Sequence, residues 1–187
     1  MRSYLKLIVF IFINMMCTQL QATTVINFSL SEQVAVAHDC VRAVVVSRHL
    51  DGDGMMQVYL EIEESVYGSM QGGFKLSIPT NIAGAPNLIP GQNYMLFLNL
   101  NNRIEQVIGL AWGAYEIHGP DEIIKDGMGQ SIELKSKADR QVNFSFSRQA
   151  PDFINGNLSY PEFKKAIQSV YHGYIAQGGR LPNRPVN

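Results

Sequence analysis

Three reactive side chains are adjacent at one point of the sequence: His38, Asp39 and Cys40. A thiol beside a histidine can act as a nucleophile, and both groups can bind zinc. Successive residues of a strand point to opposite faces, so of the three only His38 and Cys40 share a side. A metal site needs further ligands, and the sequence has no spaced set of cysteines and histidines to supply them. We therefore favour a small buried thiol at the entrance of a strand. A cysteine- or metal-dependent hydrolase centred on His38 and Cys40 is the alternative.

A second candidate is the acidic, glycine-rich run Asp-Gly-Asp-Gly at residues 51–54. It is similar to the start of a calcium-binding loop, but such a loop needs glycine at its sixth position and glutamate at its twelfth. Those positions are Met56 and Ile62. Asp-Gly next to an alternating apolar run is typical of a hairpin turn, since both residues tolerate a positive φ. The run therefore predicts a turn that presents Asp51 and Asp53 at the surface.

Aromatic side chains form a third candidate set, because exposed rings can stack on sugars or on single-stranded nucleic acid. Most of them alternate with aliphatic residues and are expected in the core, but Tyr59 shares the polar face of its segment with glutamates. The loops at residues 50–55 and 79–92 are further candidate contact surfaces, because loops on a rigid scaffold often carry binding residues. The candidate binding residues are Tyr59, Trp112, Asp51, Asp53, Asn81 and Asn87, and no catalytic residue, metal ligand or cofactor is expected.

The elements that position these residues are mostly strands. A β-branched run at 41–46 is followed by alternation of apolar and polar residues over 56–62 and over 74–78, which predicts half-buried strands. The almost continuous apolar run 94–100 predicts a strand buried on both faces, with a turn at 99–102. Further strands are expected at 107–110, 114–117, 132–134 and 142–146, loops at 79–93 and 150–157, and no clear period over 23–35. Gly109 and Gly113 indicate a bulge or a tight barrel corner beside Trp112.

The period changes near the C-terminus. Residues 159–162 (Ser-Tyr-Pro-Glu) have the spacing of a capping box with proline in the first turn, and Gly178 and Gly179 end the segment. One helical stripe is formed by Phe163, Ile167, Val170, Tyr171 and Tyr174. Many strands followed by one helix predict a mainly β fold, an OB-like barrel or small β-sandwich with a C-terminal α-helix. The expected parts are a β domain at 23–158, a helix at 159–177 packed on it, and a tail at 178–187.

The first 22 residues are typical of a secretory signal peptide. Arg2 and Lys6 precede an apolar run at residues 7–13, and the segment ends with Ala22 before Thr23. The run is shorter than the roughly 20 apolar residues of a spanning helix. We therefore expect a secreted or periplasmic protein without membrane contact beyond this segment, and an uncleaved anchor is the alternative.

Composition excludes several classes of protein. The chain has 187 residues, of which 46% are hydrophobic and 17% charged, with a net charge of −1, so it is neither disordered nor a basic nucleic-acid binder. Residues 1–22 hold two basic and no acidic residues, so the remaining 165 residues hold 13 basic and 16 acidic ones, a net charge of −3. Cys40 is their single cysteine. Without an internal disulfide, stability must come from a packed core.

The order of segments resembles a known family layout. The segments that carry the resemblance are 58–62 (Val-Tyr-Leu-Glu-Ile), 66–68 (Val-Tyr-Gly), 91–98 (Gly-Gln-Asn-Tyr-Met-Leu-Phe-Leu) and 109–115 (Gly-Leu-Ala-Trp-Gly-Ala-Tyr). Over residues 40–117 the chain resembles the OB-like barrel of tissue inhibitors of metalloproteinases and netrin-type modules, and exported bacterial proteins of unassigned function. The resemblance implies the fold rather than the inhibition, because Thr23 stands where that family has a zinc-chelating N-terminal cysteine and the family's disulfides are missing. No helix is evident in 79–93, where an OB-type barrel has one.

Together these patterns predict an exported, non-enzymatic binding or interaction domain whose partner is another exported protein and not a nucleic acid. Two alternatives remain open. One is the hydrolase centred on His38 and Cys40, and the other is a domain that holds a small ligand inside the barrel.

Overall fold

The computed structural model describes residues 28–82, 84–101, 104–108, 113–126, 129–134 and 153–180. Strands predominate in it, which confirms the predicted mainly β fold with a C-terminal helix. In chain order the elements are α2 (Leu30–Val36), β1 (Asp39–Leu50), β2 (Met55–Tyr67), β3 (Gly72–Pro79), β4 (Asn93–Asn101), β5 (Ile104–Val107), β6 (Ala114–His118), β7 (Ile123–Lys125), β8 (Ile132–Leu134), β9 (Phe153–Asn155) and α3 (Tyr160–Ala176). The expected signal peptide, the strand expected at 142–146 and Trp112 lie outside the described residues.

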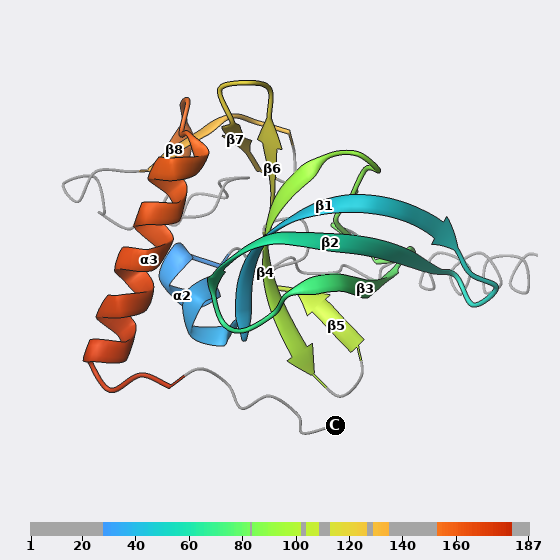
Figure 1. Ribbon diagram of the computed structural model, residues 1–187, viewed down its shortest axis with the longest axis horizontal. Coiled ribbons are helices and arrows are strands. Elements are labelled where there is room, and N and C mark those ends of the chain that lie inside the picture. Colours follow the sequence, from blue (N-terminus) through green and yellow to red (C-terminus); the bar gives the residue numbers. More distant parts are fainter. Residues whose placement is uncertain are drawn as a thin grey trace, which may run out of the picture.

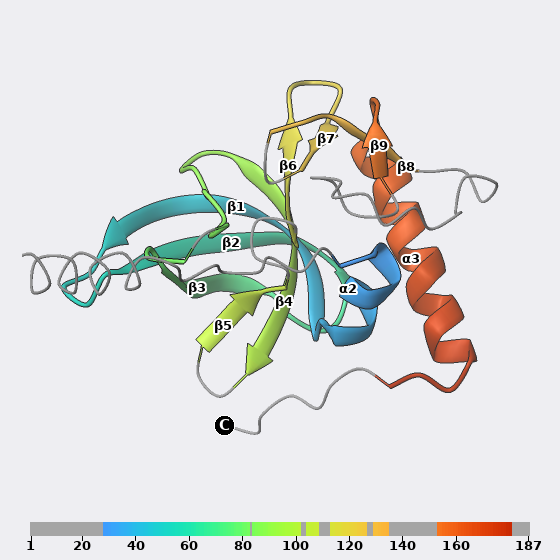
Figure 2. The same ribbon diagram turned by 180° about the vertical axis from the view of Figure 1, so that it is seen from behind.

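The strands form one antiparallel sheet in the order β3-β2-β1-β4-β6-β7, with β5 also pairing with β4, and a separate pair β8-β9. Both helices lie at one end of the sheet, and the tip of the β1–β2 hairpin lies at the other end (Figure 1, Figure 2). The sheet curves so that β3 approaches β5. No ladder joins these two strands within the described ranges, so the expected closed barrel is not found.

Strand β1 has two halves with different surroundings. Its first part, through Val44, is hydrogen-bonded to β2 on one side and to β4 on the other, and residues 39–45 are mostly buried. A register shift between Val45 and Ser47 marks a bulge at Val46. Beyond it all five residues, 46–50, are exposed. We call the outer part of β1, the first part of β2 and all of β3 the distal ribbon: residues 46–61 and 72–79.

Two apolar clusters cover the two faces of the sheet. Strand β4 separates them, because residues 94–98 are all buried and alternate between the clusters, as the continuous apolar run predicted. The inner cluster lies within the curve of the sheet and includes Val41, Val58, Leu60, Leu76, Leu88 and Leu96. The helical cluster lies under α2 and α3 and includes Val34, Cys40, Phe97, Tyr115, Phe163 and Ile167.

Helix α2 lies in the segment for which the sequence predicted no regular structure. It begins at a capping box in which the Ser29 side chain accepts from the backbone of Glu32 and the Glu32 carboxylate accepts from the backbone of Ser29. Gln33 is fully buried and exchanges hydrogen bonds of 2.8 and 3.1 Å with the hydroxyl of Tyr115 in β6. This buried polar pair connects the short helix to the sheet.

Helix α3 begins and ends as the sequence predicted. Ser159 and Glu162 form the capping box, a proline follows in the first turn, and Gly178 adopts a positive φ after the last turn. Phe163 and Ile167 are fully buried in the helical cluster, and the Tyr171 ring stacks on Tyr67 at 4.7 Å between centroids. The helix therefore packs on the sheet through the predicted stripe.

Other elements differ from the expectation. Strand β4 continues through Asn101, where a turn was predicted, β7 was not predicted, and β9 lies in a segment predicted to be a loop. Gly109 lies outside the described residues, and Gly113 lies just before β6, which pairs with β4 beside β5. A side chain on Gly113 would overlap the carbonyl of Ile108, so only glycine allows this close approach.

Candidate functional site

The cysteine cluster is part of the packed core. Cys40 is fully buried, and its thiol donates a hydrogen bond to the Met95 sulfur at 3.4 Å. Burial raises the pKa of this thiol well above its ordinary value, and the charge of Asp39 raises it further. The thiol therefore stays protonated, which gives the hydrolase hypothesis no support.

Asp39 has a structural role beside it. One oxygen of its carboxylate accepts hydrogen bonds from the backbone N–H groups of Ser69 and Met70, at 2.7 and 3.0 Å, and so holds the turn between β2 and β3. A side chain on Gly68 would overlap this carboxylate. Within the described ranges no group of three or more histidine, cysteine, aspartate or glutamate side chains could hold a metal ion.

The turn between β1 and β2 is the hairpin turn that the sequence predicted. The Asp51 carboxylate accepts from the backbone N–H groups of Asp53 and Met55, at 3.0 and 2.9 Å, and from the Gln57 side chain at 2.6 Å. The hydrogen bond from Gln57, then the one from Met55, lower the pKa of Asp51. Asp51 thus shapes the turn, while Asp53 stays exposed at its tip.

The two predicted contact loops meet at the end of the distal ribbon. Thr80 donates through its backbone N–H and its hydroxyl to the carbonyl of Gly54, at 3.2 and 2.7 Å. Asn81 follows it and is exposed. Further along the same loop, the Arg48 guanidinium donates to the side-chain oxygen of Asn87 at 2.7 Å and to the carbonyl of Leu88 at 3.1 Å. A hollow of about 190 Å³ lies between this loop and the inner side of the ribbon.

Tyr59 lies on the outer side of the ribbon, where the alternation placed it. It pairs with Ser47 on β1 and with Lys75 on β3. The His49 ring stacks on the Tyr59 ring at 5.7 Å between centroids, and the Lys75 ammonium lies 5.9 Å from the Tyr59 centroid. A second hollow, of about 360 Å³, opens beside it. We define the Tyr59 face by Val46, His49, Tyr59, Glu61, Gly73 and Lys75.

The structure therefore brings five of the six candidate binding residues to the distal ribbon and its loop. The sequence interpretation missed Arg48, His49 and Lys75. Lys75 could have been predicted from the sequence. It is one of the polar residues that alternate with apolar ones in β3, and it lies beside Tyr59 when β2 and β3 pair as a hairpin. The positions of Arg48 and His49 depend on the bulge at Val46, for which the sequence has no clear local signal.

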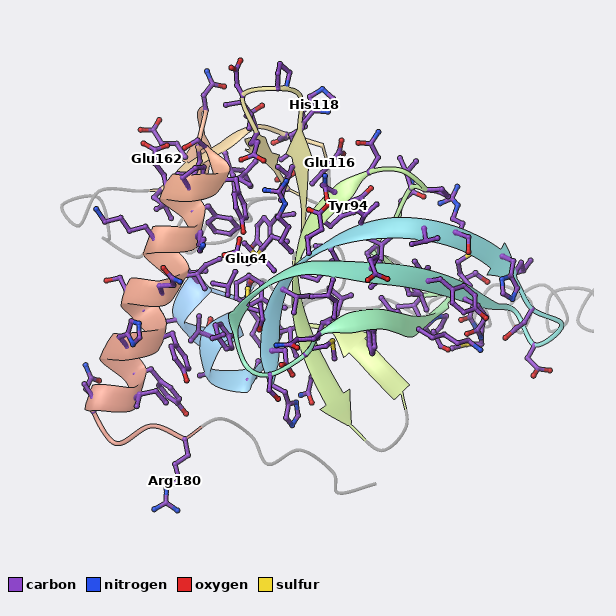
Figure 3. The ribbon with its side chains drawn as sticks, viewed as in Figure 1. Glu64, Tyr94, Glu116, His118, Glu162 and Arg180 are labelled. Carbon is purple, nitrogen blue, oxygen red and sulfur yellow. The ribbon has the colours of Figure 1, made fainter. Side chains whose placement is uncertain are left out.

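A separate charged cluster joins α3 to the sheet. Glu64 on β2, labelled in Figure 3, lies on the side of the sheet near α3. It accepts hydrogen bonds from the Tyr160 hydroxyl and the Lys164 ammonium. Arg42 pairs with Glu63 at 2.9 Å and with Glu122 at 2.8 Å, and lies 4.6 Å from the Tyr160 ring centroid. Burial raises the pKa of Glu64, but the hydrogen bonds from Lys164 and Tyr160 outweigh it and lower the pKa overall. Tyr160 and Lys164 join α3 to β2, and Glu122 joins the turn before β7 to β1, so the cluster stabilises the fold.

No model of a known protein family, no curated protein and no solved structure matches this chain. None of the helices in the described ranges has the length and apolar character required to cross a membrane.

Proposed function

We propose that the protein is an exported, non-enzymatic binding domain that contacts another exported protein through the Tyr59 face. The observation that carries the proposal is the position of the exposed apolar side chains. Among the residues described, five large hydrophobic side chains are exposed, and two of them belong to the Tyr59 face: Val46 at 60% and Tyr59 at 38%. Apolar side chains concentrated in one region of a surface are typical of a contact site.

The chemistry of the face supports a protein as the partner. A tyrosine at the centre with a lysine and a glutamate at the edge resembles the aromatic core and polar rim of protein interfaces. Stacking of His49 on Tyr59 leaves less of the ring for a base or a sugar. The mixed charges of Glu61 and Lys75 also differ from the basic surface that a nucleic acid requires.

We also propose that the curved sheet is an open relative of the OB-like barrel. The approach of β3 to β5 around the inner cluster supports this description. Protection of the β3 and β5 backbone amides from hydrogen exchange at their facing edges would show a closed barrel, and rapid exchange there would show an open sheet.

Site-specific photo-crosslinking tests the proposed contact. A photoreactive amino acid at position 59 is compared with one at Ser169, an exposed position on α3. We expect a single exported protein to crosslink from position 59 and not from position 169. With that partner purified, Tyr59→Ala should weaken binding by about tenfold or more, as for a central interface residue.

Two results would overturn the proposal: identical adducts from both positions, or unchanged affinity of the Tyr59→Ala variant. The export is tested separately by N-terminal sequencing of the protein recovered outside the cytoplasm. We expect the sequence to start at Thr23, and a start at Met1 would contradict cleavage.

A further inference from the structure

We propose that the hollow on the inner side of the distal ribbon binds a small carboxylate with an apolar chain of about six to eight carbons, and that Arg48 holds the carboxylate. This site is distinct from the Tyr59 face. Val58 and Leu60 point into the curve of the sheet, and Tyr59 between them points outward, because successive strand residues alternate. The two sites therefore lie on opposite sides of the same strand.

The walls of the hollow are apolar. Met56 and Val58 line it from β2, Ile78 from β3, and Ala85 and Leu88 from the loop. All five belong to the inner cluster or pack against it. The volume of about 190 Å³ is below that of the usual pockets for drug-sized ligands. A dry apolar cavity of about 150 Å³ binds benzene, so this hollow has room for slightly more than six carbons.

The rim carries the charge. Arg48 lines the hollow, and both of its hydrogen bonds, to Asn87 and Leu88, come from the same terminal nitrogen. Its other nitrogens have no hydrogen-bond partner in the part of the chain that is described, and no carboxylate there forms an ion pair with it. A guanidinium is always charged and matches a carboxylate with two parallel hydrogen bonds.

Asn87 adds a neutral donor. Its side-chain oxygen accepts from Arg48, which leaves the amide NH₂ beside the hollow as a second group for a carboxylate oxygen. One fixed cation next to an apolar wall selects a monoanion with a hydrocarbon part. The small volume excludes a nucleotide, and the polar side chains that line the hollow, Arg48, Thr80 and Asn87, are too few to bind the many hydroxyl groups of a sugar.

Calorimetric titration of the full chain with octanoate tests the proposal, with octanamide as the neutral control. We expect octanoate to bind at least about tenfold more tightly, because a hydrogen bond between charged groups is lost with the amide. Across butanoate, hexanoate and octanoate the affinity should rise by about fourfold for each added methylene group, and it should stop rising beyond about eight carbons. N-acetylphenylalanine and its amide form a second pair, so that a peptide C-terminus is distinguished from a free acyl chain by which acid binds more tightly.

Two variants separate the charge from the cavity. Arg48→Gln keeps a polar side chain but removes the charge, so the preference for the acid over the amide should disappear. Ala85→Leu fills the hollow without changing Arg48, so octanoate affinity should fall by about tenfold or more while the melting temperature stays the same or rises. Tyr59→Ala, on the opposite side of the strand, should leave octanoate binding unchanged.

The proposal is overturned if neither acid binds at millimolar concentration, if acid and amide bind equally to the unmodified protein, or if Ala85→Leu has no effect on octanoate affinity. If Arg48→Gln does not fold, the comparison of octanoate with octanamide and the Ala85→Leu variant still show whether the acid binds in the hollow. Crosslinking at position 59 is independent of all these results.

Discussion

The two halves of β1 belong to one continuous strand but have different surroundings. Residues 39–44 lie between β2 and β4 and are covered by the helical cluster on one face and the inner cluster on the other. As strand residues, 46–50 lie beside β2 alone, with no second strand on their other side, and they are exposed. The bulge at Val46 lies at the boundary. The same strand is therefore structural where other elements cover it and available for contacts where none do. A bulge can mark the boundary between these two parts, because it increases the local twist of the strand.

The clearest separation of the two halves is expected from thiol reactivity. Cys40 lies in the covered half, and Ser47→Cys places a second thiol in the exposed half. We expect iodoacetamide at pH 8 to modify Cys40 about 1000-fold more slowly than position 47, because Cys40 must wait for an opening that costs several kcal/mol. Peptide mapping by mass spectrometry resolves the two products. Equal rates would show that the covered half is open to solvent.

The helical cluster should show the largest single loss of stability. Phe163 is fully buried, and its ring lies 4.9 Å from that of Tyr115 in an edge-to-face contact. Phe163→Ala should lower the free energy of unfolding by about 3–5 kcal/mol, measured by denaturant titration. The exposed Ile175 on the same helix is the matched control, and Ile175→Ala should cost less than about 0.5 kcal/mol. Similar losses in both variants would mean that α3 is not held by its predicted stripe.

Glycine substitutions in the turn between β2 and β3 test the role of Asp39, which lies in the covered half of β1. Gly68 and Gly72 both have a positive φ, but only at Gly68 would a side chain overlap the Asp39 carboxylate. Gly72→Ala should cost about 1 kcal/mol from backbone strain, and Gly68→Ala about 3 kcal/mol, because it also disturbs the hydrogen bonds to Ser69 and Met70. Thermal unfolding measures both. Equal costs would contradict the role of Asp39 in this turn.

Glu64 should have a smaller effect that depends on pH. Its pKa is lowered in the folded protein, so its contribution is fully present above the pKa of an unfolded glutamate, about 4.3, and is lost as pH falls through the lower folded value. Because the side chain is about one-third exposed, Glu64→Gln should cost only about 0.5–1 kcal/mol at pH 7.

Chemical unfolding of both proteins between pH 3 and pH 7 measures this effect. The curves of the unmodified protein and of Glu64→Gln should converge toward pH 3. Glu61→Gln, on the outer side of the same strand, is the control and should follow the unmodified protein. A constant difference at every pH would mean that packing, and not charge, is lost at position 64.

The smallest effect on stability is expected at the Tyr59 face. Tyr59→Ala should change the free energy of unfolding by less than about 0.5 kcal/mol, because the ring is partly exposed and its contacts with His49 and Lys75 lie at the surface. Differential scanning calorimetry measures this. A loss of about 2 kcal/mol or more would show that the ring stabilises the ribbon, and the distinction between the two halves would then be weaker.

Local sequence patterns were sufficient to predict those elements whose burial or start is encoded in adjacent residues. Alternation located Val58, Leu60, Leu76 and Ile78 in the core, the capping box located the start of α3, and the alternation also left Tyr59 exposed. Helix α2 was missed even though Ser29 and Glu32 form the same capping box. It has only seven residues, and its buried stripe includes Gln33, which is stabilised by Tyr115, 82 positions further along the chain. Because a polar residue lies on the buried face of α2, the sequence lacks the helical spacing of apolar residues from which the helix could have been predicted.

The candidate site was predictable only in part for the same reason. Asp51, Asp53, Asn81 and Asn87 were found from turn and loop composition, which is local. The contacts that organise the site, from Arg48 to Asn87 and from His49 to Tyr59, join segments that are distant in sequence. A shift of one residue moves a side chain to the other face of a strand, so these contacts follow from the bulge at Val46 and not from composition.

The close approach of Ile108 and Gly113 has a practical consequence for engineering. Strand β5 ends at Val107 and β6 begins at Ala114, and Ile108 and Gly113 beside these ends are in contact. An added segment whose ends already meet has a small cost of loop closure, which grows only slowly with length. A fluorescent label or an affinity peptide inserted between these positions should therefore leave β5 and β6 in register, and it would provide a handle for single-molecule or pull-down work without touching either side of the distal ribbon.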